Sequence, residues 1–202
     1  MMKKILRVCM GLALVLVIAG CSNSKQAKSE SKTDSASSSS ITAKKSTTKS
    51  KPTNQPKINW RKPSENKPYP KITTSNGRYL QVDIKKQRVY VMSPEKKILY
   101  TMYASTGKDN STPRGTYQIQ AERGDFFYNK ESKEGAKYWT SWKDHGIYLF
   151  HTVPTDENGD YIKAEADNLG KSANSHGCVR LSIPDAKWIN QNVPTGTKVV
   201  IK

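Results

Sequence analysis

A cysteine near the C-terminal end of the chain lies among residue types that could activate it as a nucleophile. Residues 175–181 read Ser-His-Gly-Cys-Val-Arg-Leu, so His176 and Arg180 each lie two positions from Cys178. In an extended backbone, residues two apart share a face, and these three side chains are expected to point the same way. A thiol beside an imidazole and a permanent cation is predicted to have a lowered pKa, and the thiolate is the nucleophile. This segment therefore predicts covalent catalysis by a cysteine.

Gly177 and His151 could supply the remaining parts of such a site. Because Gly177 has no side chain, a substrate carbonyl could approach the backbone N–H groups around Cys178, which could form an oxyanion hole. His151 directly follows the apolar run 147–150. A histidine at the end of a buried strand is suited to project a base into a cleft, so the nucleophile and its base are both present.

Each of these residues also has a simpler interpretation. Cys178 could be an inert buried thiol, and His176 could act structurally by hydrogen bonding within its turn. His145 lies beside a glycine in a polar stretch and is expected to be an exposed loop residue. A zinc site could be formed by four ligands, His145, His151, His176 and Cys178. However, the close paired spacings of structural zinc sites are missing. We therefore expect no metal ion and no organic cofactor.

The candidate catalytic residues are expected to lie in a β-rich domain. Apolar and polar residues alternate over 79–84, and apolar residues resume at 89–92 after a polar turn, which is a hairpin pattern. A second turn at 93–97 leads into 98–103, so three strands in meander order are predicted. Further strands are predicted at 115–120, 146–150 and 197–201.

One helix is well marked, over the residues that follow the cysteine segment. Ser182 is a typical N-cap, Asp185 three residues later makes a capping box, and Pro184 suits the first turn. Trp188 lies on its apolar side, and the helix is expected to end before Pro194.

The polar segment 122–145 is expected to be a long excursion from the sheet. It carries Trp139 and Trp142, which are expected first as packing residues. Long loops are uncommon and often cover functional sites. This one is a candidate for covering a cleft.

The N-terminal end of the chain has a different composition from the rest. Residues 8–19 form one apolar run preceded by Lys3, Lys4 and Arg7, which is too short for a resident transmembrane helix and fits a secretory signal. The run leads into Ile-Ala-Gly-Cys ending at Cys21, which looks like a bacterial lipobox. An ordinary small-residue cleavage site with an incidental cysteine is the alternative.

These features divide the chain into three parts. Residues 1–20 are predicted to be a lipoprotein signal peptide, and residues 21–68 a lipidated cysteine followed by a disordered Ser/Lys-rich tether. Residues 22–57 contain eight lysines, two acids and no aromatic residue, so they cannot bury enough apolar surface to fold. Residues 69–202 hold the folded domain. We expect a monomer whose lipid anchor holds it on the outer face of the cell membrane, with the domain facing the wall.

The formal net charge of +17 does not point to nucleic acid. Residues 69–202 hold twenty Lys and Arg against fourteen acids, a net charge of only +6, and no nucleic-acid-binding motif is present. The remaining excess lies in the signal and the tether. A Lys-rich tether suits an anionic membrane and anionic wall polymers, so no nucleic-acid partner is expected.

Five segments form an ordered set of motifs: Ser-Thr-Gly at 105–107, Thr-Pro-Arg-Gly-Thr-Tyr at 112–117, the strand ending in His151, Leu-Gly at 169–170, and Ser-His-Gly-Cys-Val-Arg-Leu at 175–181. Through these segments the chain resembles the catalytic domain of L,D-transpeptidases, the YkuD-type family, over about residues 78 to 201. The resemblance implies a mainly β (α+β) fold with a short helix, a β-sandwich whose active-site cleft is covered by a long loop. It also implies that a cysteine is acylated by a peptidoglycan stem tetrapeptide with release of the terminal D-Ala. An amine of a second stem then resolves the thioester and gives a 3→3 cross-link.

Carried over residue by residue, the resemblance makes Cys178 the nucleophile and His151 the proton donor and acceptor. His176 is a motif histidine beside them, and the N–H groups of Gly177 and Cys178 are implied oxyanion donors. Arg180 is implied to hold the active-site strand or a substrate carboxylate. The residues implied for the substrate or the oxyanion are Ser175, Gly177 and Arg180.

Two features depart from the family pattern. Thr152 follows His151 where many members have Gly, and the gap from His151 to Ser175 is longer than usual. The additional length, about 153–168, contains Glu-Asn-Gly-Asp at 157–160, which predicts a hairpin turn that lengthens one lip of the cleft.

Two alternative functions stay open at this point. An L,D-carboxypeptidase would resolve the same thioester with water. A catalytically silent wall-binding lipoprotein would keep the fold without the chemistry, and would not be acylated by a carbapenem. The third residue of the stem peptide and the acyl acceptor are not specified by the sequence.

Overall fold

The structure is a computed structural model that describes residues 58–202. The predicted signal peptide, the predicted lipidation site at Cys21 and most of the predicted tether lie outside the described residues. Within residues 58–202, no helix is both long enough and apolar enough to cross a membrane.

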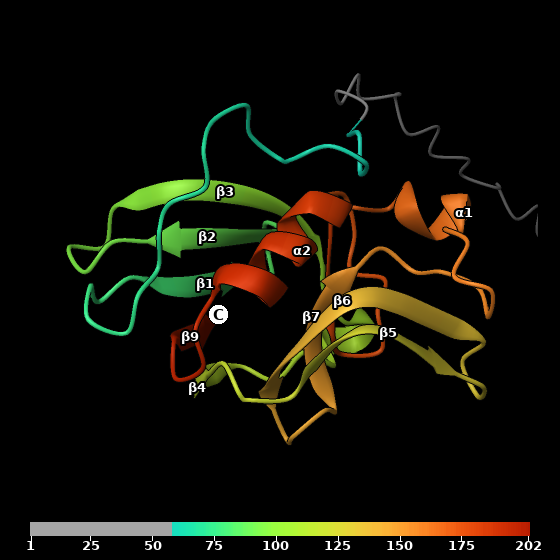
Figure 1. The fold of residues 1–202 in the computed structure, drawn as a ribbon. Coiled ribbons are helices and arrows are strands. Elements are labelled where there is room, and N and C mark those ends of the chain that lie inside the picture. The colour runs from blue at the N-terminus through green and yellow to red at the C-terminus, as the bar shows by residue number, and fades with distance from the viewer. Residues whose placement is uncertain (1–57) are drawn as a thin grey trace, which may run out of the picture. The chain divides into compact units, whose positions relative to one another are not determined.

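The described chain is built on one curled sheet of nine strands (Figure 1). Its strand order is β4-β9-β1-β2-β3-β8-β7-β6-β5. The mainly β fold with a short helix is therefore confirmed, and the layers of the expected sandwich belong to one continuous sheet. The strands are β1 Tyr79–Asp83, β2 Arg88–Met92, β3 Ile98–Ser105, β4 Gly115–Gln118, β5 Arg123–Asn129, β6 Glu134–Lys143, β7 Tyr148–Thr152, β8 Val179–Leu181 and β9 Lys198–Ile201; the helices are η1 Lys108–Asn110, α1 Lys163–Ala166 and α2 Ile183–Asn192.

The predicted meander forms as the alternation indicated. β1 pairs antiparallel with β2, and β2 with β3. Leu80 and Val82 are fully buried, whereas Gln81 between them is not, so one face of β1 is apolar and lies in the core. β9 adds in parallel beside β1 and pairs with β4 on its other side.

The middle of the sheet determines where the candidate catalytic residues meet. β7 and β8 are parallel neighbours, with His151 opposite Arg180. β8 also pairs antiparallel with β3, where Ser105 is opposite Arg180. Because Val179 is opposite Phe150 in this parallel register, Cys178, one residue before β8, is level with Leu149 and only two positions along β7 from His151.

One hydrophobic core fills the curled sheet. The edge strand β4 reaches back toward β6, and the rings of Tyr117 and Trp142 lie 5.1 Å apart. α2 packs on β6, β7 and β8 and adds Ala186 and Ile189 to the same core. The strands β7 and β8, which carry the candidate site residues, are therefore packed against α2 as well as against their neighbours in the sheet.

The helix α2 begins as predicted, but its capping box is only half formed. The Ser182 hydroxyl accepts a hydrogen bond from the Asp185 N–H, and the helix ends before Pro194. The buried Asp185 carboxylate does not return the bond. It accepts instead from the Ser64 hydroxyl at 2.5 Å and the Tyr69 hydroxyl at 2.7 Å.

The segment 58–68, assigned by its composition to the tether, packs against the folded domain. Trp60 is only 4% exposed. It packs with Val153, Ala166 and Leu169 in a second core cluster, and its carbonyl accepts from the Ile183 N–H at 2.9 Å. The folded domain therefore begins before residue 69, where it was expected to begin. The Lys-rich composition of this segment gave no sign of the apolar contact that Trp60 makes. We call residues 58–68 the arm.

The segment 122–145 is a β-hairpin, not the loop expected from its polarity. β5 and β6 pair over most of their length, and Asn129 accepts from backbone N–H groups in the connecting turn. Neither face of β5 is buried throughout, so the sequence has no apolar alternation to reveal the strand.

The inserted segment 153–168 has structure of its own. Thr155 bridges both Tyr161 and Gly135, which fastens the insertion to the start of β6. The Asp156 carboxylate accepts from two backbone N–H groups of the following turn, so the predicted turn at 157–160 is confirmed. The chain then forms the short helix α1.

Candidate active site

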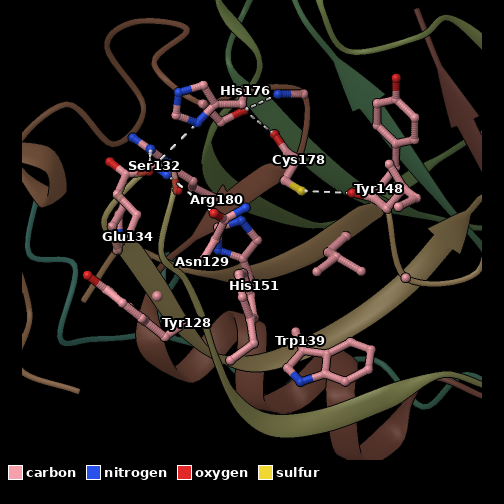
Figure 2. Close-up of a pocket in the computed structure, with 18 residues that line it drawn as sticks. Tyr128, Asn129, Ser132, Glu134, Trp139, Tyr148, His151, His176, Cys178 and Arg180 are labelled. Carbon is pink, nitrogen blue, oxygen red and sulfur yellow. Dashed lines mark hydrogen bonds and ion pairs between the residues drawn. The ribbon is translucent and has the colours of Figure 1, made fainter. Parts of the chain in front are cut away.

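A cleft of about 550 Å³ lies between the β5–β6 hairpin and the segment that precedes β8 (Figure 2). The hairpin contributes one wall, β7 the floor and residues 175–178 the opposite wall. The hairpin thus covers the cleft in the way that was expected of a loop. The lining includes Phe127, Tyr128, Asn129, Ser132, Glu134, Gly135, Trp139, Tyr148, His151, Pro154, Ser175, His176, Gly177, Cys178 and Arg180.

Cys178 is partly buried at this wall. Its thiol donates to the Ile147 carbonyl, with the sulfur 3.5 Å from the oxygen. Gly177 before it has a φ of +139°, and a Cβ there would lie 2.9 Å from the Tyr148 ring. Only glycine suits this backbone position without strain, because L side chains avoid the conformation and the ring leaves no room.

Two hydroxyl groups hold the backbone around the cysteine. The Ser175 hydroxyl donates to the Cys178 carbonyl at 2.5 Å and accepts from the Gly177 N–H at 3.1 Å. The Thr112 hydroxyl donates to the Gly177 carbonyl at 2.9 Å. The Gly177 N–H, an implied oxyanion donor, is therefore already engaged by Ser175.

His151 lies on the floor of the cleft, 6% exposed. Its Nδ1 is 2.6 Å from the Thr152 carbonyl oxygen. Since a carbonyl only accepts, Nδ1 carries the proton and Nε2 is left as the basic nitrogen. Burial, assisted by the Arg180 charge, lowers the pKa of His151 to about 4. The imidazole is therefore neutral at pH 7.

The Cys178 thiol is also neutral at rest, contrary to the sequence prediction. Burial raises the pKa of Cys178 to about 11, although a backbone hydrogen bond from Leu149 and the Arg180 charge both act to lower it. The residue types beside the cysteine suggested a thiolate, but desolvation is the larger effect here.

Arg180 and His176 do not share the direction of Cys178. Arg180 is 2% exposed and forms ion pairs at 2.7 Å with both Glu134 and Glu165. The side chain of His176 is 75% exposed, with Nδ1 3.9 Å from Glu134. The shared face was expected from extended backbone, but β8 begins only after the turn at Gly177.

Glu134 and Glu165 are the site residues that sequence reasoning missed. A buried arginine requires carboxylate partners, so the presence of such partners could be inferred once Arg180 was known to be buried. Their identity could not, because Glu134 lies on the unrecognised hairpin and Glu165 in the insertion.

The remaining candidates lie elsewhere. His145 is exposed and pairs with Glu122 at 2.7 Å. Trp142 is a core residue, whereas Trp139 lines the cleft. Among residues 58–202, no group of three or more His, Cys, Asp or Glu side chains is arranged to hold a metal ion.

Comparison with known proteins gives a consistent result. A family model described as the L,D-transpeptidase catalytic domain, YkuD, matches residues 77–201. YciB of Bacillus subtilis (strain 168), assigned by its name to the L,D-transpeptidases, is 47% identical over 148 residues, which cover 71% of this chain and 74% of the relative.

Solved structures share the fold at lower identity. An L,D-transpeptidase from Mycobacterium smegmatis is 20% identical with a TM-score of 0.51, over 62% of this chain and 58% of that chain. LdtMt1, an LD transpeptidase in complex with imipenem, is 19% identical with a TM-score of 0.51, over 62% of this chain and 59% of that chain. The matched region thus spans less than two thirds of these solved chains.

Proposed function

Because the chain belongs to the family of L,D-transpeptidase catalytic domains known as YkuD, we propose that it is a peptidoglycan L,D-transpeptidase with Cys178 as its nucleophile. The observation that carries this proposal is the pairing of β7 with β8. His151 and Cys178 line the same cleft, and the charge of the buried Arg180 acts on both.

In the acylation step, Cys178 attacks the carbonyl carbon of the third residue of a stem tetrapeptide. The thiol proton passes to Nε2 of His151 as the C–S bond forms. The C–N bond to the terminal D-Ala then breaks, and the leaving nitrogen takes the proton from His151. Two neutral groups at rest suit this sequence, because the proton moves only when the bond forms.

In the transfer step, the amine of a second stem attacks the thioester. It gives its proton to His151, the C–S bond breaks, and the thiol regains a proton. The product is a 3→3 cross-link, and no cofactor is needed. Gly177 N–H is engaged by Ser175, so we assign the oxyanion contact to the Cys178 N–H.

Arg180 is proposed to hold the active-site strand and not to bind a substrate carboxylate. Its two terminal nitrogens are both engaged by carboxylates, and its side chain is almost fully buried. His176, exposed at the rim, is proposed as a rim contact for substrate.

We also propose that Cys21 is lipidated and that the chain is anchored to the outer face of the cell membrane. The support comes from the lipobox-like Ile-Ala-Gly-Cys and its basic flank. A diacyl group and a basic tether together provide a sufficient anchor.

The test is to incubate the purified full chain with a disaccharide tetrapeptide and analyse products and protein by mass spectrometry. Cys178→Ser is the matched control, because it keeps the shape of the side chain and removes the thiol. We expect a cross-linked dimer and an acyl adduct, both absent from the variant.

Two other results would change the assignment. Tripeptide without dimer would make the protein an L,D-carboxypeptidase. If no adduct forms with any stem peptide and a carbapenem also fails to label Cys178, the silent wall-binding protein becomes the better interpretation.

A further inference from the structure

The buried Arg180 is held between two elements that flank the cleft. Its Nη2 donates to Glu134 at the start of β6, and its Nη1 donates to Glu165 in α1, both at 2.7 Å. Arg180 lies on β8, two residues beyond the nucleophile. One side chain therefore links the cysteine strand to the hairpin on one side and to the inserted segment on the other.

Glu165 contacts the cysteine segment at both of its ends. The oxygen that pairs with Arg180 also accepts from the Asn174 amide at 2.5 Å. Asn174 comes directly before Ser175, whose hydroxyl holds the Cys178 carbonyl. A single carboxylate thus fixes the two residues that bracket the nucleophile turn.

The position of Glu165 is itself well determined. Its neighbour Ala166 is buried in the cluster with Trp60. The N–H of Ile162 donates to the Pro154 carbonyl at 3.0 Å, and Thr155 bridges Tyr161. The residues before α1 are therefore held within the insertion, and Ala166 fixes α1 itself to the cluster around Trp60, although the helix is only one turn long.

The charges around the thiol depend on this arrangement. Arg180 is the cation that acts on both Cys178 and His151. Glu134 and Glu165 balance that cation, and His176 lies near Glu134 at the rim. Removing one carboxylate charge while keeping the hydrogen bonds would leave more of the Arg180 field acting on the thiol.

We propose that Glu165 is a positioning residue: by holding Arg180 and Asn174 at the two ends of the nucleophile turn, it makes the inserted segment 153–168 part of the active site. The proposal deepens the proposed function and rests on it only for the reaction that the turn serves. The geometry on which it depends is the same whichever acceptor resolves the thioester.

The experiment is the rate at which iodoacetamide alkylates Cys178 in the full chain at pH values from 7 to 10. Peptide mass spectrometry separates Cys178 from Cys9 and Cys21. Glu165→Gln keeps an acceptor for Arg180 and removes the charge. We expect its Cys178 pKa to fall by about half a unit, which raises the alkylation rate at pH 8 by about threefold. Glu165→Asp, which keeps the charge, should stay closer to the wild type than Glu165→Gln does.

Glu157→Gln is the matched control. It makes the same change of charge in the same insertion, but Glu157 is exposed in the turn and is not one of the two carboxylates paired with Arg180. A purely structural Glu165 would lower thermal stability without moving the thiol titration. Equal titrations for Glu165→Gln, Glu157→Gln and wild type, or a slower reaction in Glu165→Gln, would overturn the proposal.

The outcome is separable from that of the proposed function. If the wild type forms no cross-link but Glu165→Gln still shifts the Cys178 titration, the transpeptidase assignment fails and the positioning role stands. If the wild type forms the cross-link and the titrations are equal, the transpeptidase assignment stands and the positioning role of Glu165 fails. If both proposals are correct, Glu165→Gln should change kcat more than KM, because it alters the reacting thiol and not the walls of the cleft.

Discussion

Cys178 and His151 rest in the protonation states that burial favours. A sequence shows which residue types are adjacent, and on that basis the thiol was expected to be acidic. The pKa of a group also depends on how much water reaches it, which is decided by residues far away in the chain. At this site Phe127, from the hairpin, packs edge-on against the His151 ring at 5.7 Å. That contact contributes to the desolvation that neighbouring residue types could not indicate.

The lowered pKa of His151 predicts an acid-sensitive contribution to stability. In the unfolded chain the imidazole takes up a proton near its ordinary pKa of 6.5, whereas in the folded protein it does so only near 4. Between these values the unfolded state binds more protons, so stability falls as the pH falls through this window. The contribution is roughly 3 kcal/mol when complete.

The measurement is urea unfolding at several pH values between 7 and 4, for the wild type and His151→Asn. Asparagine can still donate to the Thr152 carbonyl but does not titrate. We expect the difference in unfolding free energy between the two proteins to shrink as the pH falls. A difference that stays constant across the window would contradict the assignment of a neutral buried histidine.

The arm is attached to α2 through the Asp185 carboxylate, which was expected to cap the helix. Ser64 donates to Asp185 through its hydroxyl and also accepts from the Tyr103 N–H at 2.9 Å. Ser64→Ala removes both bonds and leaves the buried carboxylate with one fewer donor. We expect a loss of about 1–3 kcal/mol in unfolding free energy.

Chemical denaturation of Ser64→Ala and Ser75→Ala tests this contact. Ser75 is an exposed serine with a hydrogen bond only to Thr73 among the contacts described, so its replacement should cost less than about 0.5 kcal/mol. Equal losses in the two variants would mean that the Asp185 contact does not fasten the arm.

The elements that were predicted correctly are those with a strong local pattern. The meander of β1 to β3 alternates between core and solvent, and α2 has Ser182 and Pro184 at its start. The β5–β6 hairpin and the arm were missed for a common reason. Each is stabilised by contacts with distant residues, and neither carries a periodic apolar face of its own.

The arm, the insertion and the start of α2 all contribute to the cluster around Trp60. The ring of Trp60 lies 5.4 Å from that of Tyr161 in the insertion. The proposed nucleophile segment, residues 175–181, could be identified from the sequence because its residues are contiguous. The cluster around Trp60 could not be identified from the sequence, because its members come from distant parts of the chain, including residue 60, residues 153–169 and residue 183.

This shared cluster predicts that a fragment starting at residue 69 is much less stable than one starting at residue 58. The shorter fragment loses a buried tryptophan, which alone is worth about 3–5 kcal/mol. We expect its Tm to be lower by about 10 °C or more. Thermal unfolding by circular dichroism of fragments 58–202 and 69–202 measures this, with Trp60→Ala in the longer fragment as a comparison. Equal Tm values would show that the arm is dispensable.

The burial of the Cys178 thiol affects how easily the protein is oxidised. With the pKa raised to about 11, only about one molecule in ten thousand carries a thiolate at pH 7. Peroxides and other oxidants attack the thiolate, and oxidation beyond sulfenic acid is in general irreversible. In the proposed mechanism the thiol keeps its proton until the C–S bond forms, so we expect the resting protein to resist oxidation at Cys178.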